Sequence, residues 1–98
     1  MSDNTEDIER IARIVYDAIF QNRPSVEING EAYSVKRTSK SRVRFIEHEG
    51  LTYMEQNKLK SSTWGKEAQE GHQILWVMRG RQYLARIRDG KFLDLKKR

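Results

Sequence analysis

The chain has 98 residues, of which 34% are charged and 37% hydrophobic, so it is long enough for one small domain but not for two. Its 19 lysines and arginines against 14 acids give a net charge of +5, which suits a nucleic acid, an anionic membrane surface or an acidic protein partner. The absence of cysteine excludes disulfides and thiolate metal sites and favours a reducing cytoplasm. Without an apolar run near 18 residues or a signal-peptide pattern, we expect neither a membrane span nor secretion.

Residues 3–22 are expected to form an amphipathic helix. Asp3 and Glu6 make a capping-box pattern at its start, and Pro24 stops it. Apolar residues recur at helical spacing: Ile8, Ile11, Ala12, Val15, Ala18 and Ile19. Three more widen this stripe, namely Ile14, Tyr16 and Phe20. Core packing is the expected role of the helix, and contacts in a homodimer are the alternative.

Residues 25–57 are expected to form two β-hairpins, because the apolar period changes from helical spacing to two. The first turns at Asn29-Gly30, a strong hairpin signal, and a two-residue turn places Val26 opposite Tyr33. The second turns at Glu49-Gly50 after a polar, basic connection.

Residues 62–70 are expected to form a short helix that Ser62 caps and Gly71 closes, and residues 73–95 a three-stranded meander. Residues 96–98 form a basic tail. Two-residue turns at Arg79-Gly80 and Asp89-Gly90 predict one apolar-aromatic face and one reverse face. The first pairs Trp76 with Tyr83 and Ile87 with Phe92, beside Ile74 and Ala85. The reverse face carries Leu75, Val77, Leu84, Arg86, Arg88 and Leu93.

A sheet that is apolar on both faces needs cover on both, and one helix covers only one. The second sheet face is therefore expected to contact a partner, a dimer mate or a bound strand. The predicted class is α+β with a mainly antiparallel sheet.

Catalytic signatures are missing from the sequence, which contains no phosphate-binding loop, dinucleotide fingerprint or nucleophile elbow. The two histidines, His48 and His72, are too few for a zinc site. We therefore expect no cofactor, no metal and no enzymatic activity. A histidine after a helix-ending glycine, as His72 is, most often caps or packs.

Aromatic and basic residues alternate in the second half of the chain. Single-stranded nucleic acids are bound by this combination, because cations meet phosphates and rings stack on bases. The exposed N–H groups at the start of the short helix also suit an anion. The candidate nucleic-acid-binding residues are Arg42, Arg44, Tyr53, Gln56, Asn57, Lys58, Lys60, Trp64, His72, Trp76, Arg79 and Arg81. For Trp64 and Trp76 the alternative is a purely structural place in the core.

Residues 51–95 contain the following runs: Tyr53-Met54-Glu55-Gln56-Asn57, Lys60-Ser61-Ser62-Thr63-Trp64, Ala68, Glu70-Gly71-His72, Ile74-Leu75-Trp76-Val77, Tyr83 and Arg88-Asp89-Gly90. This pattern resembles the ThermoDBP-like single-stranded DNA-binding proteins of thermophilic archaea. The resemblance implies a small sheet-and-helix domain that holds single-stranded DNA, or RNA, in a basic and aromatic cleft with little sequence preference. The matching positions are Tyr53, Gln56, Asn57, Trp64, His72, Trp76 and Arg79. Longer relatives carry a helical extension for oligomerisation that has no counterpart up to Arg98, so the resemblance implies no oligomeric state.

The predicted function is sequence-tolerant binding of single-stranded DNA or RNA by a cytoplasmic protein. Two alternatives use the same residues. One is a small accessory or protein-interaction subunit of a DNA replication or repair complex, docked through its doubly apolar sheet. The other is a duplex-DNA chromatin protein whose apolar side chains wedge between base steps.

Overall fold

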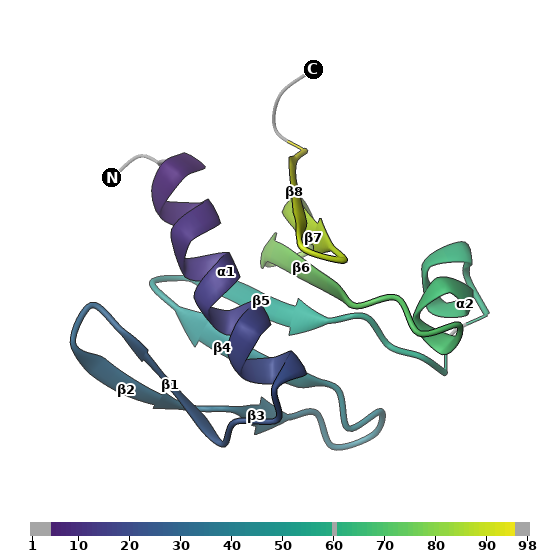
Figure 1. Cartoon of the computed structure of the whole chain (residues 1–98), viewed down its shortest axis with the longest axis horizontal. Helices are drawn as coiled ribbons and strands as arrows, with labels where there is room; N and C mark the ends of the chain where they lie inside the picture. Colours follow the sequence, from purple (N-terminus) through teal and green to yellow (C-terminus); the bar gives the residue numbers. More distant parts are fainter. Residues whose placement is uncertain (1–4, 60, 96–98) are drawn as a thin grey trace.

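The computed structural model describes residues 5–59 and 61–95 (Figure 1). The predicted α+β class with antiparallel sheets is confirmed. In chain order the elements are α1 (Thr5–Phe20), β1 (Ser25–Ile28), β2 (Glu31–Ser34), β3 (Lys36–Arg37), β4 (Arg44–His48), β5 (Leu51–Glu55), α2 (Thr63–Gln69), β6 (Ile74–Arg79), β7 (Gln82–Arg88) and β8 (Lys91–Asp94). The expected Asp3 cap, Lys60 and the basic tail of residues 96–98 lie outside the described residues.

Strands β3 to β8 form one six-stranded antiparallel sheet in chain order, and β1 pairs with β2 in a separate two-stranded sheet. The short strand β3 was not predicted, because Lys36 and Arg37 are exposed and polar and pair only along one edge of β4. The turn at Asn29-Gly30 has φ values of 52° and 83°, the positive pair that a type I′ hairpin turn requires. This turn aligns Val26 with Tyr33, as predicted.

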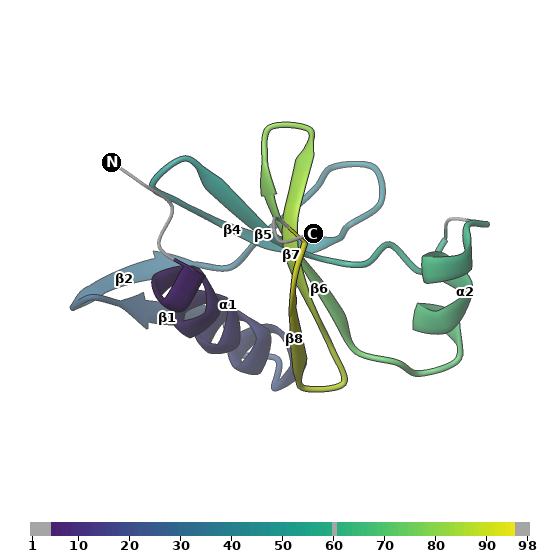
Figure 2. The ribbon, with the colours of Figure 1, turned by 90° about the horizontal axis from the view of Figure 1, so that it is seen from above.

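Helix α1 supplies one side of the core. Its predicted apolar stripe is buried from Ile8 to Ile19 against β1 and the middle strands of the large sheet. The three residues that widen the stripe also pack within the domain: Ile14, Tyr16 and Phe20 are half-buried against the same core. Figure 2 shows α1 beside the β1–β2 hairpin, with α2 at the other end of the molecule.

The large sheet has two unlike faces. We call the one that packs against α1 the core face; its buried residues include Ile46, Tyr53, Leu75, Val77, Ala85 and Ile87. We call the opposite one the outer face; side chains from every strand lie on it, because directly paired residues of antiparallel strands point to the same side.

The predicted pairing of Trp76 with Tyr83 is wrong. The turn was expected at Arg79-Gly80, but Arg79 pairs with Gln82, so the turn residues are Gly80 and Arg81. A register shift between Val77 and Met78 then pairs Val77 with Ala85 and Trp76 with Arg86, while Tyr83 pairs with Met78. The extra residue on β7 is Leu84, and a β-bulge of this kind leaves no mark in the alternation of the sequence. Ile87 does pair with Phe92, but on the core face.

The bulge also redistributes the predicted faces. Ala85, Ile87 and Phe92 belong to the core face. Arg86, Arg88 and Leu93, expected on the reverse face, lie on the outer face with Trp76. The outer face therefore combines aromatic, apolar and basic side chains.

Candidate nucleic-acid interface

A continuous row of paired residues crosses the outer face, with one residue from each strand of the large sheet. In order from β3 to β8 the row is Lys36, Phe45, Met54, Trp76, Arg86 and Leu93. Phe45, Met54 and Trp76 are each partly exposed, and Leu93 is 46% exposed. The middle of the row is thus an apolar shelf flanked by cations, rather than part of the core.

Three aromatic rings and one guanidinium gather at the β6–β7 part of this row. The Trp76 ring lies 5.6 Å from the Trp64 ring at 80° and 4.8 Å from the Tyr83 ring at 58°. The Arg86 guanidinium carbon lies 4.0 Å from the centre of the Trp64 ring and 5.8 Å from that of Trp76. We call Trp64, Trp76, Tyr83 and Arg86 the aromatic cluster. Tyr83 is its most exposed ring, at 52%.

Helix α2 brings Trp64 to the cluster. As predicted, Ser62 caps it, and the Ser62 hydroxyl accepts a hydrogen bond from the Gly65 N–H at 3.2 Å. This N–H is therefore occupied by the cap rather than available to an anion. At the far side of α2, Glu67 accepts a hydrogen bond from Arg88 of β7 at 2.7 Å.

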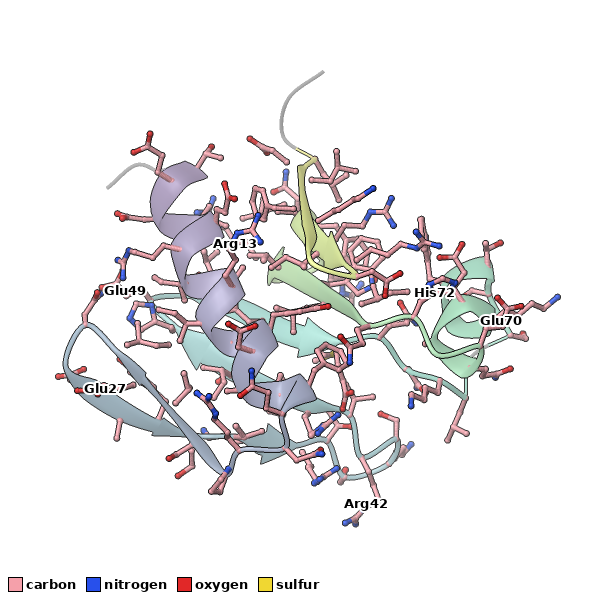
Figure 3. All side chains as sticks on the ribbon, viewed as in Figure 1. Arg13, Glu27, Arg42, Glu49, Glu70 and His72 are labelled. Carbon is pink, nitrogen blue, oxygen red and sulfur yellow. The ribbon has the colours of Figure 1, made fainter. Side chains whose placement is uncertain are left out.

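His72 fixes the end of the α2 segment, which agrees with a capping or packing role. Its Nδ1 lies 2.7 Å from Asp89 Oδ2 in the β7–β8 turn, and Figure 3 shows it beside α2. A hydrogen bond from the Gln73 backbone N–H, and a second from His72, hold the pKa of the Asp89 carboxyl below its ordinary value. These hydrogen bonds join His72, Gln73 and Asp89, and none of them includes a side chain of the aromatic cluster.

An open groove of about 330 Å³ lies next to the aromatic cluster. We call it the basic groove. Its lining residues are Asn22, Arg37, Ser41, Arg42, Val43, Arg44, Glu55, Gln56, Asn57, Lys58 and Leu59. Four of these are cationic and only Glu55 is acidic, so the groove carries a net positive charge. Arg42 occupies the outer end of the β3–β4 connection (Figure 3).

Gln56 connects the groove to the cluster. Its Oε1 accepts a hydrogen bond from the Trp76 indole N–H at 2.7 Å, and its Nε2 donates to the Asn57 carbonyl at 3.1 Å. Asn57 in turn accepts from the Leu59 backbone N–H at 2.7 Å and shapes the loop that carries Lys58. The two parts of the surface are therefore contiguous.

Arg44, a candidate phosphate contact, has a structural role. Its guanidinium hydrogen-bonds both oxygens of Glu55, at 2.8 and 3.0 Å, and donates to the Ile19 carbonyl at the end of α1 at 2.7 Å. The hydrogen bond to Glu55 raises the pKa of Arg44, against the opposing effect of burial. With its charge paired, Arg44 anchors α1 to the sheet rather than serving as a phosphate contact.

Tyr53 is the clearest correction among the predicted stacking residues. It is only 1% exposed and packs in the core under α1, where no base can reach it. The reason is the alternation of strand β5, which turns Tyr53 to the core face and its neighbour Met54 to the outer face.

The other candidates divide into three groups. Lys58 and Arg42 join Gln56 and Asn57 in the basic groove, and Trp64 joins Trp76 in the cluster. Arg79 and Arg81 are exposed around the β6–β7 turn and do not line the groove.

The surface also contains residues that were not among the candidates, including Lys36, Arg37, Phe45, Tyr83 and Arg86. A two-residue turn at Glu49-Gly50 pairs Phe45 with Met54 and so places both apolar side chains on one face of the sheet. This spacing is the sequence signal for the apolar shelf. For Arg86 no such signal exists, because the bulge determines its face.

Comparisons with protein-family models, curated proteins and solved structures found no match to this chain, so the family resemblance stays an expectation. In the part of the chain that the structure describes, no three histidine or acidic side chains are grouped so that they could hold a metal ion. No helix there has the length and apolarity to cross a bilayer.

Proposed function

We propose that this protein binds single-stranded nucleic acid, DNA or RNA, with little sequence preference across its outer face. The observation that carries this proposal is the hydrogen bond between Trp76 and Gln56, which makes the aromatic cluster and the basic groove one surface. A strand with alternating phosphates and bases needs cations and rings on the same surface.

The roles follow from exposure and charge. Arg37, Arg42 and Lys58 are exposed cations of the groove and are suited to phosphates. Tyr83 and Trp76 present rings on which bases stack, and each such stack contributes about 1–3 kcal/mol. Phosphate contacts and ring faces carry no base code, so weak sequence preference is expected. The compartment we propose is the cytoplasm.

Fluorescence anisotropy with labelled oligonucleotides of about 15 nucleotides tests this function. Each phosphate neutralised on a single strand contributes a slope of about −0.7 to the plot of log affinity against log salt. With the three groove cations engaged, we expect a total slope near −2. Competition by single strands should exceed competition by a duplex of the same length. A flat salt response would exclude the proposal, and a duplex preference would favour a chromatin protein.

A protein partner is the second candidate, because two large apolar side chains are exposed to solvent. Leu59 at the groove is 78% exposed, and Leu93 at the end of the outer row is 46% exposed. An accessory subunit of a DNA-processing complex, or a homodimer joined through the outer face, would cover them. In that case analytical ultracentrifugation shows self-association that oligonucleotides do not reverse.

A further inference from the structure

Arg86 is the most unusual residue of the aromatic cluster. Its guanidinium stacks 4.0 Å from the centre of the Trp64 ring, on the side chain that α2 lays over the outer face. Trp76 stands nearly perpendicular to Trp64 at the same place. A flat, delocalised group thus lies against an indole in the way that a nucleobase does.

Within residues 5–59 and 61–95, one nitrogen of the Arg86 guanidinium lacks a hydrogen-bond partner. Its Nη1 atom is buried, and among the described residues it has no hydrogen-bond partner. A buried donor without an acceptor costs free energy, and more when the donor is charged. Burial and the nearby Arg88 cation also lower the pKa of Arg86.

Neighbouring charges do not relieve this cost. Arg88 donates a 2.7 Å hydrogen bond to Glu67, the acid that acts on the charge of Arg86. Glu67 acts on Arg86 only through space, and that effect is smaller than the effect of burial. Arg86 therefore holds an unused hydrogen-bond donor beside a ring face.

We propose that the Arg86 guanidinium occupies the place of a base in the unbound protein. When a single strand binds, a nucleobase replaces the guanidinium against Trp64, and Arg86 turns outward to pair with the adjacent phosphate. The site is thus a subsite for one nucleotide, base and phosphate together. This inference rests on the proposed function.

The contacts that the exchange breaks are replaced by others. The stack against Trp64 is kept, because one planar group replaces another, and the unpartnered Nη1 gains a phosphate oxygen. Guanidinium–phosphate hydrogen bonds are charge-assisted and geometrically matched, so the arginine makes a stronger contact outside the stack than within it. Helix α2 is held to the sheet by the side chains of Trp64, Glu67 and His72, not by strand pairing. Small shifts of α2 therefore leave the pairing of the strands intact.

NMR of the arginine side chains tests the exchange directly. In the unbound protein the Arg86 Nε–H signal should be shifted upfield by the ring current of Trp64. Saturation with a thymidine decamer should move it to the range of exposed arginines. Inorganic phosphate at the same phosphate concentration should leave it in place. An Arg86 signal that stays upfield in the saturated complex, or that phosphate alone releases, would overturn the exchange.

Three substitutions add a test by affinity. Arg86→Met fills the stack without a charge and should weaken oligonucleotide binding about tenfold or more. Its melting temperature should stay equal or rise, because the unpartnered donor is removed. Arg86→Lys keeps the cation for phosphate and should bind within about threefold of the parent chain. Arg10→Met removes a cation from exposed α1, away from the outer face, and should change affinity by less than about twofold.

The outcomes separate this inference from the function on which it rests. If the parent protein binds no oligonucleotide, the proposed function fails. If it binds, but Arg86→Met binds equally well, only the subsite is wrong. If both Arg86 variants melt at a lower temperature but bind oligonucleotide with unchanged affinity, the role of Arg86 is purely structural and the exchange is rejected.

Discussion

The carboxylate of Glu55 holds the guanidinium of Arg44 in a two-point pair, with Nε to Oε2 at 2.8 Å and Nη2 to Oε1 at 3.0 Å. The two side chains are only 17% and 11% exposed. Since Arg44 also donates to the Ile19 carbonyl at 2.7 Å, the pair joins the end of α1 to β4 and β5. This one residue pair thus connects the helix that builds the core to the strands that frame the basic groove.

Glu55→Gln is expected to destabilise the fold by about 2 kcal/mol, because it leaves the Arg44 charge partly buried without its counter-ion. Urea unfolding measures the difference. The matched control is Glu9→Gln, which breaks the exposed pair with Arg13 and should cost less than about 0.5 kcal/mol. Equal effects of the two variants would contradict the anchoring role of Arg44.

Tyr83→Ala should lower oligonucleotide affinity about tenfold, since it removes the most exposed stacking ring of the cluster. The fold should lose little stability, because Tyr83 is 52% exposed and lies outside the core. Tyr53→Phe serves as the control, and its affinity should remain within about twofold of the parent value because residue 53 is buried in the core. Anisotropy titrations at one salt concentration compare the three proteins. Weaker binding by Tyr53→Phe alone would show that the outer face is not the binding face.

Arg42→Met and Lys58→Met should each make the salt dependence of binding shallower by about 0.7 in log–log slope, because each removes one phosphate contact. Their effects should add, since the two cations line different walls of the groove, one from the β3–β4 connection and one from the loop after β5. Arg10→Met on α1 should leave the slope unchanged. Slopes that do not change in the groove variants would place the phosphates elsewhere.

Asp89→Asn tests the contact between the β7–β8 turn and the α2 segment. The folded-state pKa of Asp89 lies below its ordinary value of 3.8, so the ionised carboxylate stabilises the fold above that pH, and the contribution is lost as pH falls through the lowered value. Asparagine also accepts the positive φ of 52° at this position, so the turn itself should persist.

Thermal melts at several pH values measure this contribution. We expect the variant to melt a few degrees below the parent protein near pH 6, and the difference to shrink progressively as pH falls below 3.8 through the lowered pKa of Asp89. A gap of constant size across this range would mean that the charge of Asp89 is not its cause.

Several features follow from local sequence alone. The helical spacing of α1, the Ser62 cap of α2 and the turns at Asn29-Gly30, Glu49-Gly50 and Asp89-Gly90 predict most elements and three hairpin connections. These signals are local because a cap or a two-residue turn depends on the backbone conformation of a few neighbours. The composition likewise determines the net positive charge and the absence of disulfides.

Tertiary structure decided which of these residues share a surface. The same alternation allows Tyr53 to face either side of the sheet, and only the packing of α1 buries it and exposes Met54. The bulge at Leu84 places Arg86 beside Trp64, and the basic groove combines segments from before β4 and after β5. Sequence patterns report the period of each strand, whereas the choice of face and the meeting of distant loops depend on contacts between elements far apart in the chain.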